Sequence, residues 1–279
     1  MGLTVVSMGM SAPELVVSLV AAVGGKGDLA IGNVVGSNLA NIGLVLGISA
    51  IVKPLNVSGR VVTREVPVML LVTALLLPVI LDLRIARLEG LAMLVVLVAY
   101  LWFVFRTAKD EDEEVLGEYA PFAKYAAGLT PWAAARDLGL ITMGIAGLVL
   151  GAFAIRESVV ALAEVMGISE LVIGLTLVSI GTSLPELATS LVATMRKEED
   201  IAVGNIIGSN VFNIAAILGI TATVSPLPVS PEVLRLEFPA AVIMSVLLVP
   251  IVRANLTIRR AEGMILLGTY LALGAWVLL

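Results

Sequence analysis

The chain has 279 residues with a formal net charge of −5, and 59% of its residues are hydrophobic against 14% charged. Together with a mean hydropathy of +1.07, this composition is typical of a polytopic helical membrane protein and excludes an ordinary soluble domain. The chain contains no Cys and no His, which excludes disulfides, thiol chemistry, His-ligated zinc and His-containing catalytic triads. We therefore expect a protein that is not an enzyme, carries no cofactor and binds no nucleic acid.

Windows of about 20 apolar residues predict nine membrane crossings. They cover Gly2–Val23, Ala30–Val52, Val66–Leu83, Leu88–Phe105, Leu138–Val160, Leu171–Met195, Ile201–Val224, Phe238–Val252 and Ala261–Leu279. No basic segment stands before the first apolar stretch, so we expect no cleavable signal peptide.

The distribution of basic residues predicts the orientation in the membrane. When the loops are assigned to alternate sides, twelve of the 17 Lys and Arg residues fall on one side and five on the other. Because an excess of Lys and Arg marks the cytoplasmic side, we expect a multi-pass protein of the cell membrane with the long linker 106–137 in the cytoplasm and the C-terminus outside. The charged run Lys109–Glu114 in this linker is interpreted as a solvated segment, with regulatory cation sensing as the alternative.

The sequence contains an internal repeat. Gly2–Val57 aligns with Gly174–Val229 at a constant offset of 172 residues, without a gap and with 31 identities in 56 positions. Equivalent crossings are five apart, an odd number, so the two repeats must have opposite orientations in the membrane. We therefore predict a first repeat over residues 1–107, a linker over 108–137 and a second repeat over 138–279. The first-repeat counterpart of the leading helix Leu138–Val160 would lie before Met1, and the architecture with that helix would be five plus five.

Each repeat carries, within an apolar crossing, a hexapeptide that ends in Pro-Glu. The proline is expected to interrupt the helix there. The two hexapeptides are Gly9-Met10-Ser11-Ala12-Pro13-Glu14 and Gly181-Thr182-Ser183-Leu184-Pro185-Glu186. A charged side chain near the middle of a membrane helix costs a few kcal/mol, and proline frees main-chain carbonyls beside it. Carboxylate and carbonyl oxygens are the ligands of hard cations. We predict that the hexapeptides form one cation site, the alternative being that each Glu is a hydrogen-bonded packing residue.

A second polar element follows each hexapeptide. Its polar residues recur every four positions and so lie on one helical face. They are Asn33, Ser37 and Asn41 in the first repeat and Asn205, Ser209 and Asn213 in the second. We interpret these residues as facing the two carboxylates. The alternative is that the neighbouring glycines and these polar groups serve only helix packing.

The paired elements G-x-S-x-P-E and G-N-x-x-G-S-N-x-x-N resemble those of the calcium/cation antiporter superfamily, and most closely those of prokaryotic sodium/calcium exchangers. The resemblance covers nearly the whole chain. It implies an all-α polytopic membrane protein with the inverted-repeat sodium/calcium exchanger-like fold, with nine transmembrane helices here, or five plus five with the first helix missing. It further implies that four core helices hold the cation sites, and that the first and sixth helices of the full fold slide across the core as a gating pair.

The resemblance also implies a set of ligands. Calcium would be held by the side chains of Glu14 and Glu186 and by the main-chain oxygens of Met10 and Thr182. Flanking sodium sites would use Ser11, Ser183, Ser37, Ser209 and the carbonyls of Ser7 and Ser179, with Asn41 and Asn213 completing the middle. Two residues depart from the family pattern. Met10 stands where Thr is usual, and Asn213 stands where the sodium/calcium branch often has Asp.

The function implied by this resemblance is secondary active antiport, in which calcium is exchanged for sodium across the cell membrane by alternating access. A proton-coupled or potassium-dependent calcium/cation antiporter is the alternative. A passive cation channel is less favoured, because broken helices from two inverted repeats favour alternating access. The expected partners are the lipid bilayer and the transported ions, Ca²⁺ and Na⁺ or H⁺, and the expected state is a monomer.

Overall fold

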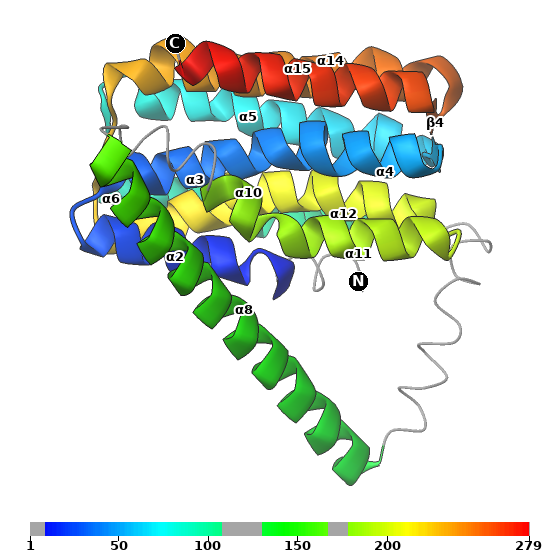
Figure 1. Ribbon diagram of the computed structural model, residues 1–279, viewed down its shortest axis with the longest axis horizontal. Coiled ribbons are helices and arrows are strands. Elements are labelled where there is room, and N and C mark those ends of the chain that lie inside the picture. Colours follow the sequence, from blue (N-terminus) through cyan, green and yellow to red (C-terminus); the bar gives the residue numbers. More distant parts are fainter. Residues whose placement is uncertain (1–8, 108–129, 167–177, 279) are drawn as a thin grey trace.

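The computed structural model describes residues 9–107, 130–166 and 178–278, and these residues are almost entirely helical (Figure 1). The first part of the chain contains α2 (Ala12–Val23), α3 (Gly27–Ala40), η1 (Asn41–Leu46), α4 (Gly47–Val52), β1 (Leu55–Asn56), η2 (Val61–Glu65), α5 (Val66–Ile80), β2 (Arg84–Ile85) and α6 (Arg87–Thr107). The segments labelled η are π-helical turns that continue directly into α-helices. The acidic run and Ser7 lie outside the described residues.

The remainder of the described chain contains α8 (Pro131–Met166), α10 (Ser179–Thr182), α11 (Leu184–Met195), α12 (Glu199–Phe212), η5 (Asn213–Leu218), α13 (Gly219–Val224), β3 (Leu227–Pro228), η6 (Val233–Glu237), α14 (Phe238–Asn255), β4 (Thr257–Ile258) and α15 (Arg260–Leu278). Most of these helices run roughly parallel across the view, whereas α8 leaves the bundle obliquely (Figure 1). The helix α8 contacts the rest of the chain mainly through α2 and α10.

Five helices within the described ranges are long and apolar enough to cross a membrane. They are Gly27–Val52, Val61–Ile80, Arg87–Val104, Ala202–Val224 and Val233–Asn255. Each corresponds to a predicted crossing, and α15 matches the predicted crossing at the end of the chain. The predicted crossing Leu138–Val160 lies inside the longer helix α8, so the end of the predicted linker, from Pro131 onward, is helical.

Two crossings begin earlier than the sequence predicts. The helix that contains α5 starts at Val61 instead of Val66, and the helix that contains α14 starts at Val233 instead of Phe238. In both repeats a π-helical turn carries charged residues ahead of the apolar stretch. These charges end the apolar window in the sequence, but the helix continues through them. In the first repeat Arg60 donates to Glu65 at 3.1 Å across this turn, which pairs the partly buried carboxylate locally.

The hexapeptides interrupt their helices, as predicted. Backbone angles of φ −80° and ψ 8° at Ser11, and φ −86° and ψ 2° at Ser183, separate the helical residues described before each break from the following helix. Pro13 and Pro185 stand in the first turns of α2 and α11, where a missing N–H group is tolerated because that donor has no intrahelical partner. The break therefore places the acidic residue that follows each proline at a helix start.

Contacts between the repeats are reciprocal. Strand β1 pairs with β4, and β2 pairs with β3; β1 is equivalent to β3 in the repeat alignment, and β2 to β4. Close helix contacts follow the same rule, since a Cβ atom on Gly90 would lie 2.8 Å from the Gly219 carbonyl oxygen and one on Gly263 would lie 2.8 Å from that of Gly47. This exchange of partners is consistent with the two-fold relation that an inverted repeat requires.

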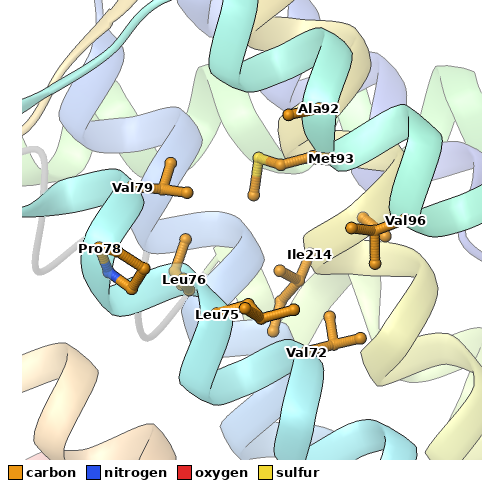
Figure 2. Close-up of a pocket in the computed structure, with 10 residues that line it drawn as sticks. Val72, Leu75, Leu76, Pro78, Val79, Ala92, Met93, Val96 and Ile214 are labelled. Carbon is orange, nitrogen blue, oxygen red and sulfur yellow. The ribbon is translucent and has the colours of Figure 1, made fainter.

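One apolar cavity marks a difference between the repeats. A space of about 190 Å³ lies between α5, α6 and η5, and Figure 2 shows apolar side chains of all three elements lining it. At the equivalent place in the second repeat, a Cβ on Gly43 would lie 2.3 Å from Tyr270 Cβ and 2.4 Å from Met244 Cε. The first repeat has Leu97 and Val72 at the positions of Tyr270 and Met244. The smaller side chains leave the space unfilled.

This packing predicts that Gly43→Ala destabilises the protein, although the second repeat has Ala at the equivalent position. The added methyl group would overlap Tyr270 Cβ, which moves only with its helix, so we expect a loss of about 1–3 kcal/mol. Thermal unfolding of the purified protein in detergent measures the effect. Gly268→Ala is the matched control, because a Cβ there meets nothing within 4 Å and Ala favours a helix. An unchanged midpoint for Gly43→Ala would contradict the tight contact.

Candidate cation site

Glu14 and Glu186 are fully buried in the first turns of α2 and α11. None of their four carboxylate oxygens has a hydrogen-bond partner among the described residues. The two carboxylates are close enough to interact electrostatically, so the structure brings the acidic residues of the two repeats together. Buried carboxylates without donors are costly in a low-dielectric environment, and a bound cation or protons would remove that cost.

The hydroxyl group of Thr182 connects the second hexapeptide to the polar face of α3. Its Oγ1 donates to Asn33 Oδ1 at 3.3 Å and lies 3.3 Å from Ser37 Oγ. The Asn33 amide nitrogen donates in turn to Ser18 Oγ at 3.0 Å and to the Glu14 main-chain oxygen at 3.3 Å. These contacts fix the start of α11 against α3 and tie the two repeats together beside Glu14.

Met10 breaks the chemical symmetry of the site. Its sulfur accepts a hydrogen bond from Asn205 Nδ2 at 3.6 Å, whereas the Thr182 hydroxyl contacts the equivalent Asn33. A thioether is a soft ligand and does not suit Na⁺ or Ca²⁺. The first repeat therefore lacks the hydroxyl oxygen that the second repeat provides here. The roles of the Met10 and Thr182 main-chain oxygens as ligands stay predictions.

The predicted serine ligands fall into two groups. The hydroxyls of Ser11, Ser183 and Ser209 are buried, and none has a hydrogen-bond partner among the described residues. Ser179 differs, because its hydroxyl contacts the carbonyls of Gly32 and Asn33 at 3.3 and 3.2 Å. Its own carbonyl accepts from the backbone N–H of Ser183 at 3.0 Å and lies 3.3 Å from the Thr182 hydroxyl, so part of its capacity to bind a cation is already used.

Asn41 and Asn213 begin the π-helical turns η1 and η5, and both side chains are fully buried. Each amide nitrogen donates a hydrogen bond, whereas each amide oxygen has no partner in the described part of the chain. The turn η1 packs against α11, which carries Glu186, and η5 packs against α2, which carries Glu14. π-helical turns occur often at functional sites, and here they bring amide oxygens to the helices that bear the carboxylates.

Several buried polar groups near the two carboxylates were not identified from the sequence. Ser190 follows Glu186 by one helical turn, is fully buried and has no partner for its hydroxyl among the described residues. Its equivalent, Ser18, binds Asn33. The identity of these two serines in the repeat alignment was the available signal. The motif G-N-x-x-G-S-N-x-x-N also contains Asn38 and Asn210, and both are buried and form cross-repeat hydrogen bonds.

The donor set fits a hard cation. Within the described ranges no three Asp or Glu side chains gather around one point, so two carboxylates must be supplemented by neutral oxygens. The buried oxygens without partners belong to carboxylates, hydroxyls and amides, which suit Na⁺ and Ca²⁺ rather than softer metals. With both Glu residues ionised the site carries a charge of about −2, which one divalent cation neutralises.

Comparisons with known proteins agree with this chemistry. Residues 1–106 and 137–279 match the model of the family described as sodium/calcium exchanger protein. The inner membrane protein YrbG of Escherichia coli is 36% identical over 253 residues, which cover 88% of this chain and 75% of that protein. The putative antiporter CaxA of Alkalimonas amylolytica is 38% identical over 227 residues, which cover 81% of this chain and 70% of that protein.

Solved structures of the sodium-calcium exchanger NCX_Mj superpose with TM-scores of 0.73 to 0.75, depending on the ion soak. In the soak with 2.5 mM Na⁺ and 10 mM Sr²⁺ the sequence identity is 31%, and the match covers 98% of this chain and 85% of that one. These matches confirm the predicted membrane-embedded helical fold. The chain belongs to the sodium/calcium exchanger family.

Proposed function

We propose that the chain is a secondary active antiporter that exchanges Ca²⁺ for Na⁺ across the cell membrane by alternating access. The observation that carries this proposal is the pair of buried carboxylates, Glu14 and Glu186, which come from opposite repeats and lack donors among the described residues. Membership of the exchanger family supports it, as does the name of the relative CaxA, a putative antiporter.

The physical basis of exchange is charge neutralisation in the bilayer. One Ca²⁺ bound by Glu14 and Glu186 cancels both negative charges, and Na⁺ ions on the same carboxylates and on the nearby hydroxyl and amide oxygens cancel them equally. The empty site keeps uncompensated charge, whose burial costs several kcal/mol. The protein can therefore change between its inward-facing and outward-facing conformations when the site is loaded, but not when it is empty. This requirement couples the movement of Ca²⁺ to that of Na⁺.

Movement is assigned to α8, the leading helix of the second repeat, whose first-repeat counterpart would lie before Met1. This helix contacts α2 and α10, the two elements that flank the breaks in the hexapeptides. A displacement of α8 along the core would therefore reach both halves of the site. In this arrangement the linker is cytoplasmic, the C-terminus is outside, and one monomer contains both repeats of the exchanger.

Proton coupling is the second candidate for the driving ion. Met10 replaces a hydroxyl-bearing residue and Asn213 carries no charge, so the site has fewer hard ligands for Na⁺ than the family pattern provides. Two buried carboxylates could bind two protons in place of sodium ions. This variant of antiport uses the same residues and differs only in the gradient that drives calcium movement.

Calcium uptake into proteoliposomes separates these functions. We expect uptake when the vesicles are loaded with Na⁺ and diluted into Na⁺-free medium, and no uptake when a pH gradient replaces the sodium gradient. Protein-free liposomes with the same gradients are the control. Uptake driven by the pH gradient alone would assign proton coupling, and calcium flux that needs no opposing gradient would assign a passive channel.

Glu14→Gln and Glu186→Gln should each lower the rate of exchange by at least about 100-fold, because each removes a charged ligand from a buried site. Membrane insertion should be intact, since a neutral side chain is cheaper in the bilayer. Glu237→Gln is the matched control, because Glu237 is also fully buried without a partner among the described residues but is the last residue of η6, outside the two hexapeptides. Near-normal exchange by Glu14→Gln or Glu186→Gln would remove that residue from the site.

Met10→Thr should raise the apparent affinity for calcium, by roughly tenfold if one additional hard ligand or ordered hydroxyl is gained. The new hydroxyl would face Asn205 as Thr182 faces Asn33. Concentration dependence of calcium uptake measures the change. Met10→Leu keeps an apolar side chain of similar size and adds no oxygen, so it should bring no gain. Equal affinities for the Thr and Leu variants would show that this position does not influence the cation.

A further inference from the structure

Four asparagines form a closed cross-repeat cluster next to the two π-helical turns. Asn38 and Asn41 belong to the first repeat, and Asn210 and Asn213 are their equivalents in the second; all four side chains are buried. Four hydrogen bonds join them across the repeats: Asn38 Nδ2 to the Asn210 main-chain oxygen at 3.1 Å, Asn210 Nδ2 to the Asn38 main-chain oxygen at 3.4 Å, Asn41 Nδ2 to Asn210 Oδ1 at 3.0 Å, and Asn213 Nδ2 to Asn38 Oδ1 at 2.9 Å.

These bonds determine which way every amide points. A main-chain carbonyl can only accept a hydrogen bond, so the amide nitrogens of Asn38 and Asn210 must face those carbonyls. The Oδ1 atom of Asn38 is thereby turned towards Asn213, and that of Asn210 towards Asn41. Because each Oδ1 can only accept a hydrogen bond, Asn213 and Asn41 must present their amide nitrogens to it. The Oδ1 atoms of Asn41 and Asn213 are left pointing away from the cluster, buried and without a partner among the described residues.

We propose that Asn38 and Asn210 are positioning residues that hold the amide oxygens of Asn41 and Asn213 towards the transported cation. This proposal rests on the proposed function, because it concerns the same site. The assignment is crossed: Asn38 of the first repeat orients Asn213 of the second, and Asn210 orients Asn41. The orientation of each amide ligand is therefore determined by a side chain from the opposite repeat.

The orientation matters because the two ends of an amide have opposite effects on a cation. The oxygen of a carboxamide is a hard ligand, whereas its NH₂ group carries only donors. An amide that rotates by half a turn would replace an attractive ligand by a repulsive group. Without an acceptor on the cluster side, Asn41 or Asn213 would lose the interaction that disfavours this rotated state.

A purely structural role predicts something different. Polar side chains in membrane proteins hydrogen-bond across helices and hold them together, and removal of such a bond would destabilise the bundle whatever residue stands at position 41 or 213. A carboxylate separates the two roles. Aspartate presents an oxygen in either orientation and has no amide nitrogen, so it needs no residue to orient it.

The test is a double-mutant cycle on the full chain in nanodiscs, with calcium affinity measured by isothermal titration calorimetry. We expect Asn38→Leu to weaken calcium binding about tenfold in the otherwise unchanged protein. On the Asn213→Asp background the same substitution should change the affinity less than about twofold. On the Asn41→Asp background, which is the matched control, the tenfold loss should persist.

The mirror experiment exchanges the partners. The effect of Asn210→Leu should be suppressed by Asn41→Asp and not by Asn213→Asp. Asn38→Ala and Asn210→Ala replace the Leu variants where those do not insert. Thermal midpoints without cation are recorded for every variant, and a destabilisation shared by all backgrounds cancels in the cycle.

The possible outcomes separate this proposal from the proposed function. An equal loss of affinity on all three backgrounds would assign Asn38 to packing and overturn the positioning role, as would the absence of a loss in the otherwise unchanged protein. Calcium binding with the expected cycle but without sodium-driven exchange would overturn the proposed exchange of Ca²⁺ for Na⁺ and keep the positioning role. A parent protein that binds neither Ca²⁺ nor Na⁺ would overturn both.

Discussion

Oxygen atoms buried in a bilayer need donors or cations, and the polar interior of this bundle follows from that constraint. The amide donors of Asn33, Asn41 and Asn213 are already engaged. The amide nitrogen of Asn33 binds Ser18 and the Glu14 main chain, and those of Asn41 and Asn213 bind the neighbouring asparagines. What remains around Glu14 and Glu186 consists of oxygens without partners in the described part of the chain. Carboxylate and amide oxygens that only accept, together with hydroxyl oxygens that can turn their lone pairs to a ligand, form a binding environment for a hard cation.

Much of this arrangement follows from local signals in the sequence. Glu14 and Glu186 stand out because a carboxylate in an apolar crossing has few explanations, and the prolines before them predict the helix breaks because a missing N–H group cannot be compensated by solvent. The repeat alignment predicts that the two breaks are equivalent. The comparisons confirm the family and the helical fold, whereas the individual ligands remain predictions.

Other features depend on three-dimensional context that a sequence window does not contain. The crossings at Val61 and Val233 begin ahead of the apolar stretch, because π-helical turns accommodate charged residues that hydropathy treats as a boundary. The role of Asn38 depends on the main-chain oxygen of Asn210, which lies in the other repeat. The packing of Gly43 against Tyr270 likewise depends on which helices meet. The last two of these facts depend on contacts between the repeats, which no single segment of the sequence contains.

Differences between the repeats carry their own physical meaning. If two inverted repeats were chemically identical, exchanging their conformations would produce inward-facing and outward-facing states of equal free energy. Any preference for one of these states must therefore arise where equivalent residues differ. Lys53 is such a position, because it forms an ion pair with Glu199 and donates to the Thr194 carbonyl at 3.1 Å. The side chain of its equivalent, Ser225, donates a neutral hydrogen bond of 3.3 Å to the Ala22 carbonyl. The two ends of the core are thus held with different strength by the same fold.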